Sequence, residues 1–202
     1  MGDKKLNVDN AYKVQTPEEN RALYDAWAQT YDSGFAEAMD FLMPGHVARL
    51  FRELKGQGPV LDAGAGTGLV AAAIVGAGHP EIDALDISPE MLEVARSKGL
   101  YRKTIVADLT RALPIPDCAY KAVTSCGTFT HGHVGPEALD ELLRVAAPGA
   151  LFVLTIKKRS ISKTGAFPGS SRATRTGSTD SRPSNSLFTE PPLIPRMRVI
   201  PP

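Results

Sequence analysis

The most informative segment of this chain is Val60-Leu61-Asp62-Ala63-Gly64-Ala65-Gly66-Thr67-Gly68-Leu69, which joins a short apolar run to an Ala-rich helical pattern. Its alternating glycines allow the backbone to turn sharply and allow a ligand to approach main-chain N–H groups at the start of a helix. Asp62 comes just before the turn, where its carboxylate can accept hydrogen bonds from a cationic amine. We therefore expect a strand, a ligand-binding turn and a helix, although a purely structural turn would use the same glycines.

Short apolar runs alternate with helical patterns on both sides of this turn. Strands are expected at residues 59–61, 82–87, 104–107, 120–125 and 150–156, and helices at residues 69–77, 89–98 and 136–146. Ser88 suits the N-cap of the second of these helices, and Pro89 suits its first position. This order predicts an α/β fold with a doubly wound, Rossmann-like parallel sheet of about five strands.

Residues 1–55 have an amphipathic helical pattern and are expected to form a cap on residues 56–156. Thr16-Pro17-Glu18-Glu19 has the residues of a capping box with proline at the first helical position. The apolar residues that follow recur every four residues on one helix face: Leu23, Trp27 and Tyr31.

Residues 157–202 differ from the rest in composition. They hold nine of the chain's 23 Lys and Arg residues and two of its 22 acidic residues, together with eight serines and seven prolines. This composition predicts a basic, disordered tail. The acidic balance of residues 1–156 argues against nucleic acid binding by the fold itself, although the tail could contact RNA or anionic lipid. The strand at 150–156 would then be a bare apolar edge, open to self-association.

Other classes of protein are excluded by simple counts. Two cysteines, Cys118 and Cys126, provide neither a disulfide framework nor a set of metal ligands. No apolar run reaches the roughly 18 residues that a membrane-spanning helix needs. The first residues, Met1-Gly2-Asp3-Lys4-Lys5-Leu6, are not a signal peptide. We expect a cytoplasmic protein without a membrane span.

Two further acids follow predicted strands. Asp86 lies about twenty residues beyond the glycines, where a carboxylate can chelate ribose hydroxyls; the alternative is a capping role for the next helix, for which Ser88 is already placed. Asp83, in mid-strand, is less suited to binding. Asp108 ends the third strand, where it could accept from the exocyclic amine of an adenine, or be an ordinary loop acid. Ile87 and Met91 could form apolar contacts with the adenine ring, or they could belong to the core.

These segments carry a family resemblance. Residues 62–68 resemble motif I of class I S-adenosylmethionine-dependent methyltransferases, residues 85–92 resemble their second motif, and residues 107–109 their third. Residues 24–32 look like the N-terminal cap helix of members that act on small molecules. Gly99-Leu100-Tyr101 and residues 127–134 are most similar to the Williams–Beuren-region methyltransferase-like proteins. The resemblance covers about residues 20–156.

The resemblance implies S-adenosylmethionine as cofactor, with its methionine part along Asp62, Gly64 and Gly66, its ribose at Asp86 and its adenine amine at Asp108. The aromatic residues of the cap would close over it, where a ring near the sulfonium gains from cation–π attraction; core packing is the alternative for them. The full set assigned to cofactor binding is Tyr24, Trp27, Tyr31, Asp62, Ala63, Gly64, Gly66, Asp86, Ile87, Met91, Asp108, Leu109 and Ser125.

The methyl acceptor is expected beside residues 125–133, which follow the fourth strand. Methyl transfer is an in-line displacement, and alignment of the nucleophile with the methyl group can supply much of its catalysis. His131 and His133 are the available bases if the acceptor must lose a proton, although loop histidines are common on protein surfaces. They have no third ligand nearby, so no metal site is expected.

Two functional classes remain beside methyl transfer to a small molecule. Family members usually continue beyond the fifth strand with a helix and an antiparallel pair, which this sequence replaces with the basic tail. The chain could therefore be a non-catalytic remnant that binds the cofactor or a partner. A nicotinamide-dependent oxidoreductase would need Gly-x-Gly-x-x-Gly, and Leu69 occupies the third glycine position.

Overall fold

The computed structural model describes residues 14, 16–36, 42–75, 80–129, 134–135, 137–156 and 196–200. They form one parallel sheet with the strand order β3-β2-β1-β4-β5-β6. The strands are β1 (Val60–Ala63), β2 (Ile82–Asp86), β3 (Lys103–Val106), β4 (Tyr120–Phe129), β5 (Ala146–Ile156) and β6 (Arg196–Ile200). The predicted doubly wound α/β fold is confirmed by this order, which reverses direction between β1 and β4.

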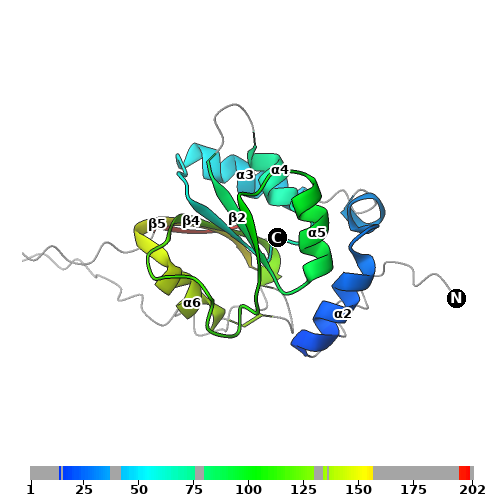
Figure 1. The fold of residues 1–202 in the computed structure, drawn as a ribbon. Helices are drawn as coiled ribbons and strands as arrows, with labels where there is room; N and C mark the ends of the chain where they lie inside the picture. The colour runs from blue at the N-terminus through cyan, green and yellow to red at the C-terminus, as the bar shows by residue number, and fades with distance from the viewer. Residues whose placement is uncertain are drawn as a thin grey trace, which may run out of the picture.

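Helices cover both faces of the sheet (Figure 1). They are α2 (Pro17–Trp27), the π-helix η1 (Tyr31–Ala36), α3 (Met43–Glu53), α4 (Leu69–Ile74), α5 (Pro89–Ser97) and α6 (Ala138–Val145). In Figure 1, α3, α4 and α5 lie on one side of the sheet and α6 on the other, while α2 lies beside α5 as a cap. None of these described helices is long and apolar enough to cross a membrane.

Successive side chains along each strand point to opposite faces of the sheet, so the buried core is divided between the two faces. One buried cluster joins α3 and α4 to Val60, Ile82, Ala122, Leu151 and Val153. The other joins α6 to Leu61, Leu85, Val123, Phe152 and Leu154. β1 and β2 are therefore buried on both faces, as strands inside a parallel sheet are.

Two helix starts agree with the sequence. The Thr16 hydroxyl oxygen accepts a hydrogen bond from Glu19 N at 3.1 Å at the start of α2. At the start of α5, the Ser88 hydroxyl oxygen accepts from Met91 N at 3.0 Å. Each cap satisfies a backbone N–H that has no partner within its helix, and this fixes where the chain enters the helix.

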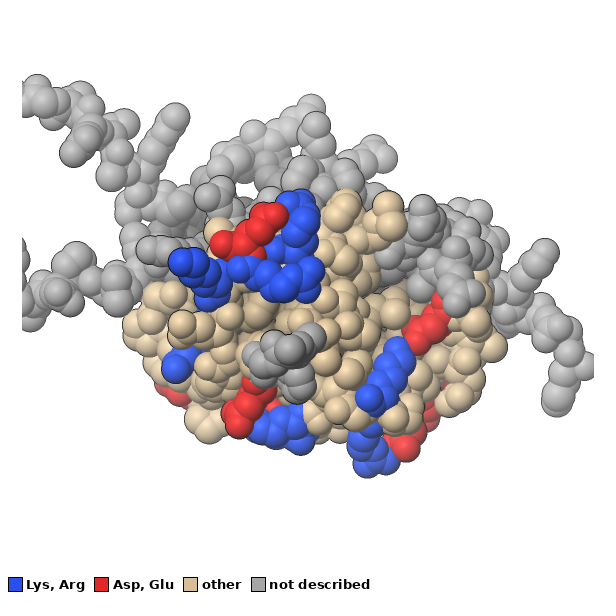
Figure 2. Space-filling view, turned by 90° about the horizontal axis from the view of Figure 1, so that it is seen from above, with Lys and Arg blue, Asp and Glu red and all other residues tan. Residues whose placement is uncertain are grey.

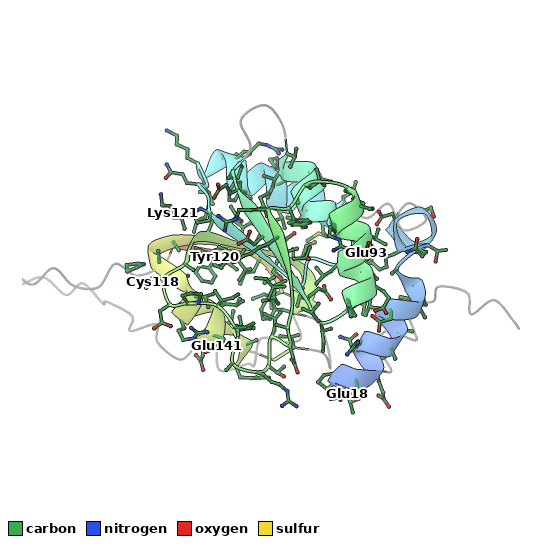
Figure 3. The ribbon with its side chains drawn as sticks, in the orientation of Figure 1. Glu18, Glu93, Cys118, Tyr120, Lys121 and Glu141 are labelled. Atoms are coloured by element: carbon green, nitrogen blue, oxygen red, sulfur yellow. The ribbon has the colours of Figure 1, made fainter. Side chains whose placement is uncertain are left out.

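The loop from β3 to β4 is held by α6 rather than by a helix of its own. Arg144 donates to the carbonyl oxygens of Leu113 (3.1 Å) and Ile115 (2.8 Å), and Glu141, labelled in Figure 3, accepts from Leu113 N at 2.7 Å. Proline-interrupted residues 110–117 are therefore an ordered connection. The described residues of this stretch contain no helix, as the sequence predicts.

The far edge of the sheet corrects one expectation. β6 pairs in parallel with β5, from Leu151 opposite Arg196 to Thr155 opposite Ile200. The sequence allows a short extended piece near Met197–Ile200 within the predicted tail, and the structure has a strand at residues 196–200, so β5 is not the bare edge that was expected. An apolar edge strand offers a row of unpaired backbone groups, and a short extended segment of the same chain can satisfy them. Residues 157–195 lie outside the described residues.

Charged side chains of both signs share the surface. Figure 2 shows Lys and Arg beside Asp and Glu on the face seen from above, with uncharged surface between these groups. Exposed pairs such as Arg49–Glu53, with Nη1 and Oε1 2.7 Å apart, are of this kind. Such pairs add little to stability because water screens them.

Asp83 is a buried acid of β2. Its side chain is 0% exposed and accepts from Arg102 Nε at 2.9 Å, from Arg102 Nη2 at 2.7 Å and from the Tyr120 hydroxyl at 2.7 Å. Burial alone would raise the pKa of Asp83, but these hydrogen bonds outweigh it and the pKa is lowered. Its role is structural, which explains why a mid-strand acid of this kind is unsuited to ligand binding.

We expect Arg102→Leu to lower the free energy of unfolding by about 2 kcal/mol at pH 7, because it removes the two charged hydrogen bonds of a buried carboxylate and leaves Lys103 Nζ, 3.6 Å away, as its cationic partner. Asp83 has a lower pKa folded than unfolded, so its contribution is present above the unfolded pKa and is lost as the pH falls below about 4. Urea unfolding at pH 7 and at pH 3.5 should show a deficit that shrinks in acid.

Arg49→Leu is the matched control, because it removes an arginine from an exposed pair. Its effect should stay within about 0.5 kcal/mol at pH 7. Equal destabilisation by the two substitutions, or a deficit for Arg102→Leu that does not change with pH, would contradict the assignment.

Candidate functional site

A cavity lies at the carboxyl ends of the first four strands, where the sheet reverses its strand order. It encloses about 980 Å³ of space, counted together with its opening to solvent. Its walls come from the turn after β1, the ends of β2 and β4, the residues after β3, and the cap. The segments that line it are thus far apart in the sequence.

The turn after β1 depends on glycines in the left-handed region. Gly64 has φ of +69° and Gly66 has φ of +53°. A Cβ added at Gly64 would lie 2.0 Å from the Thr128 hydroxyl oxygen, whereas one added at Gly66 would meet no atom within 4 Å. Gly64 N and Ala65 N both donate to Leu85 O, at 2.8 and 3.0 Å. The turn is therefore fixed to the end of β2 and leaves open space at Gly66.

Asp86 joins the turns that follow β1 and β2. Its Oδ2 accepts from Gly66 N at 2.8 Å and its Oδ1 accepts from Ser88 N at 2.9 Å. The half-buried carboxylate lines the cavity, and burial raises its pKa in spite of the backbone donors. Ser88 caps α5 itself, so Asp86 is available to a ligand, as the sequence analysis favours.

Asp62 lies one layer behind the cavity. It is 0% exposed and is not among the lining residues. Its Oδ1 accepts from the Thr124 hydroxyl at 2.9 Å, and its Oδ2 accepts from the Tyr101 hydroxyl at 2.7 Å. Burial raises the pKa of Asp62 to about 6, against these two hydrogen bonds, and the negative charge of Asp86 adds to the increase.

The adenine side of the predicted site is lined by Asp108 and Leu109, beside Ile87 and Met91. Asp108 Oδ1 accepts from the N–H of Thr110 at 2.8 Å and from its hydroxyl at 2.7 Å. The carboxylate therefore orders its own turn as well as facing the cavity. Met91 is 1% exposed and packs against Trp27 of the cap, so it serves the core as well.

The cap supplies the opposite wall through Tyr24 and Tyr31. Trp27, which is 4% exposed, packs beneath them, with its ring edge-on to Tyr24 at a centroid distance of 5.6 Å. For Trp27 the structure therefore shows core packing, whereas the two tyrosines face the cavity.

Hydrogen bonds fasten the cap to both turns of the site. The Ser88 hydroxyl donates to Asp25 Oδ1 at 2.5 Å, and the Thr67 hydroxyl donates to Asp32 Oδ1 at 2.5 Å. Lys98 Nζ donates to Asp32 Oδ2 at 2.6 Å and to Thr67 O at 2.7 Å. No local pattern in the sequence marks these partners, because each tie joins segments that are distant along the chain.

Nine of the predicted cofactor-binding residues line the cavity: Tyr24, Tyr31, Gly64, Gly66, Asp86, Ile87, Met91, Asp108 and Leu109. Trp27, Asp62, Ala63 and Ser125 are not lining residues; Ser125 donates to Ala63 O at 2.7 Å within the sheet. His131 and His133 lie outside the described residues, so their predicted role as bases stays a prediction.

Sequence reasoning missed several lining residues, among them Asn20, Thr67, Cys126 and Thr128. The Asn20 Oδ1 atom is buried without a hydrogen-bond partner in the described part of the chain. Its position one helical turn before Tyr24 is the signal that could have found it. Burial raises the pKa of the Cys126 thiol to about 12, and the negative charge of Asp62 adds to the increase. The thiol is thus neutral at physiological pH.

Comparison with known proteins agrees with this geometry. The sequence profile of a methyltransferase domain matches residues 60–149. Methyltransferase-like protein 27 of Homo sapiens is 36% identical over 160 residues, which cover 77% of this chain and 65% of that protein. Demethylmenaquinone methyltransferase of Thermus thermophilus is 39% identical over 100 residues, which cover 47% of this chain and 45% of that enzyme.

The fold agrees as well. The 1,6-didemethyltoxoflavin-N1-methyltransferase of Burkholderia thailandensis, solved with S-adenosylhomocysteine, superposes with a TM-score of 0.50 at 20% identity, over 70% of this chain and 64% of that one. The chain spans 65% and 45% of the length of the two curated relatives. Domain profile, relatives and fold lead to one conclusion: this chain belongs to the class I S-adenosylmethionine-dependent methyltransferases.

Proposed function

We propose that this chain binds S-adenosylmethionine in the cavity described above and transfers its methyl group to a small-molecule acceptor. The observation that carries the proposal is the link between Gly66 N and the Asp86 carboxylate, 2.8 Å apart, in the wall of the cavity. It places a glycine turn with open space beside an acid at the end of the next strand. A nucleoside that carries an amino-acid chain needs both parts, because the turn can meet the chain and the acid can bind the ribose hydroxyls.

The residues present fit the cofactor in three respects. Open space at Gly66 allows a ligand to approach the backbone of the turn, since an added Cβ there would meet nothing within 4 Å. The Asp86 carboxylate accepts from backbone N–H groups and still has lone-pair capacity for a ribose hydroxyl. The buried, unpartnered Oδ1 of Asn20 is an acceptor within the described residues that a bound donor would satisfy.

When bound, S-adenosylmethionine supplies a methyl group on a positively charged sulfur, which a nucleophile approaches in line. Tyr24 and Tyr31 would face this charge with their rings, and each cation–π contact contributes about 1 kcal/mol. Burial, with Tyr24 nearby, raises the pKa of Tyr31, so its hydroxyl keeps its proton. The cap thus provides neutral, polarisable groups that exclude water from the reacting atoms.

A small acceptor suits the described cavity better than a polymer, because residues of the cap form one of its walls. The Thermus enzyme is named for demethylmenaquinone and the Burkholderia enzyme for didemethyltoxoflavin, which are both small molecules. His131 and His133 remain the proposed bases for an acceptor that must lose a proton.

Isothermal titration with S-adenosylhomocysteine tests the cofactor site. We expect saturable binding of one equivalent by the folded chain, and an absence of heat would refute the proposal. Incubation with cofactor that carries a labelled methyl group, in fractions of small-molecule extract, tests catalysis. Binding without labelled product in any fraction would favour the non-catalytic alternative.

Gly66→Ala should weaken binding of S-adenosylhomocysteine at least tenfold, because the new Cβ occupies the open space at the turn. Gly99→Ala is the matched control: its φ is +66°, and an added Cβ there also meets no atom within 4 Å, but Gly99 does not line the cavity. Each substitution should lower stability by about 1 kcal/mol through backbone strain. Equal affinities of the two variants would contradict the site.

Asp62→Asn should stabilise the ligand-free chain while it weakens cofactor binding. The pKa of Asp62 is about 6 when folded, above its unfolded value of 3.8, so the native state loses stability as the pH rises between these values. Asparagine avoids this loss, and unfolding free energy at pH 7.5 should rise by on the order of 2 kcal/mol. Urea unfolding at pH 4 should show no such gain. A destabilised variant at pH 7.5 would refute the prediction.

A further inference from the structure

We propose that Tyr101 is a positioning residue of the cofactor site, whose hydroxyl holds the carboxylate of Asp62 while its ring supports the glycine turn. The proposal rests on the cofactor binding proposed above. Tyr101 is not a lining residue of the cavity, so any effect on the ligand passes through the residues that Tyr101 contacts. Tyr101 belongs to Gly99-Leu100-Tyr101, one of the segments that carry the subfamily resemblance.

The hydroxyl of Tyr101 completes the hydrogen bonding of a buried acid. It donates to Asp62 Oδ2 at 2.7 Å, while the Thr124 hydroxyl of β4 donates to Oδ1 at 2.9 Å. Each oxygen of a 0% exposed carboxylate thus receives one O–H donor. Burial raises the pKa of Tyr101 far above its usual value, and the negative charge of Asp62 adds to the increase, so this phenol remains a donor.

The ring of Tyr101 packs under the last glycine of the turn. A Cβ added at Gly68, where φ is +90°, would lie 2.9 Å from Cε2 of Tyr101. The same ring packs against the buried cluster of Ala65, Ala84 and Leu92. One residue thus contacts the acid before the turn and the glycine after it, and fixes their separation.

Lys98 acts on the same turn from the same segment of chain. Its Nζ donates to Thr67 O at 2.7 Å, next to Gly68. Residues 98–101, between α5 and β3, therefore hold the glycine turn although they do not line the cavity themselves. A rigid turn matters because a preorganised site binds its ligand without first ordering the backbone.

Among the groups around Asp62 that the structure describes, only the two O–H donors favour the charged form of its carboxyl group. Asp86 at the end of β2 opposes its ionisation, and Cys126 of β4 is a neutral thiol. In the part of the chain that the structure describes, no Lys or Arg forms an ion pair with Asp62. A carboxylate that accepts hydrogen bonds is favoured in its charged form, and loss of one donor raises its pKa. The ammonium group of the ligand's amino-acid part, which S-adenosylhomocysteine also has, prefers the charged form, so affinity follows the ionisation of Asp62.

Tyr120 provides a matched control within the same sheet. Its hydroxyl donates to the buried Asp83 at 2.7 Å, the same distance as between Tyr101 and Asp62. Tyr120 is the first residue of β4 (Figure 3), at the sheet end opposite the cavity, and Arg102 holds Asp83 charged as well. Replacement of Tyr120 therefore removes an equivalent hydrogen bond from a carboxylate outside the site.

Titration with S-adenosylhomocysteine between pH 5.5 and 8.5 compares the full-length wild type, Tyr101→Phe and Tyr120→Phe. Wild-type affinity should fall as the pH drops through about 6. For Tyr101→Phe we expect this midpoint to move up by about one unit, which weakens binding about fivefold at pH 6 and little at pH 8.5. Tyr120→Phe should keep the wild-type profile. Protonation of Asp86 or of the ligand should change the affinity of all three proteins equally, so it does not alter the comparison.

The pH dependence of the deficit separates positioning from a general loss of structure. A Tyr101→Phe profile that coincides with the wild type, or a deficit of equal size at every pH, overturns the proposal. Thr124→Val removes the other donor to Asp62 and should shift the midpoint in the same direction, which preserves the test if Tyr101→Phe does not fold. Failure of the wild type to bind at any pH refutes the proposed function itself, and this proposal with it.

Discussion

The site depends on one hydrogen bond, from Gly66 N to the carboxylate of Asp86. It exists because β1 and β2 are adjacent and parallel, with Ala63 opposite Leu85, so that the turns after both strands meet at one edge. Leu85 O adds to the constraint by accepting from two successive amides of the first turn. Core packing sets the strand register, and the register in turn sets the distance between the turn and the acid.

The elements that the sequence predicted well are those encoded locally. The succession of strands and helices along the chain, the caps at Thr16 and Ser88 and the glycine turn all follow from residue patterns within a few positions. The location of Asp86 was also predictable, because an acid at the end of a second parallel strand lies at the carboxyl edge of the sheet, beside the turn that follows the first strand. Its contact with the turn joins residues twenty apart in sequence, yet the fold class already implied it.

Contacts between distant segments could not be read from the sequence. Asp25 meets Ser88 and Asp32 meets Lys98 across separations of 63 and 66 residues, and neither pair has a local signature. Asp62 was predicted to meet the ligand directly, but its strand continues into the core and turns the side chain toward Tyr101 and Thr124. The pairing of residues 196–200 with β5 also joins segments that are distant along the chain.

The attachment of the cap has a kinetic consequence. α2 and η1 form a wall of the cavity, yet they are anchored to the two turns through Asp25 and Asp32. A molecule covered by that wall can depart on this side only as those anchors separate. Its residence time therefore depends on Asp25 and Asp32, which do not line the cavity. Affinity is set by the lining residues, whereas the rate of release on this side is set by the anchors.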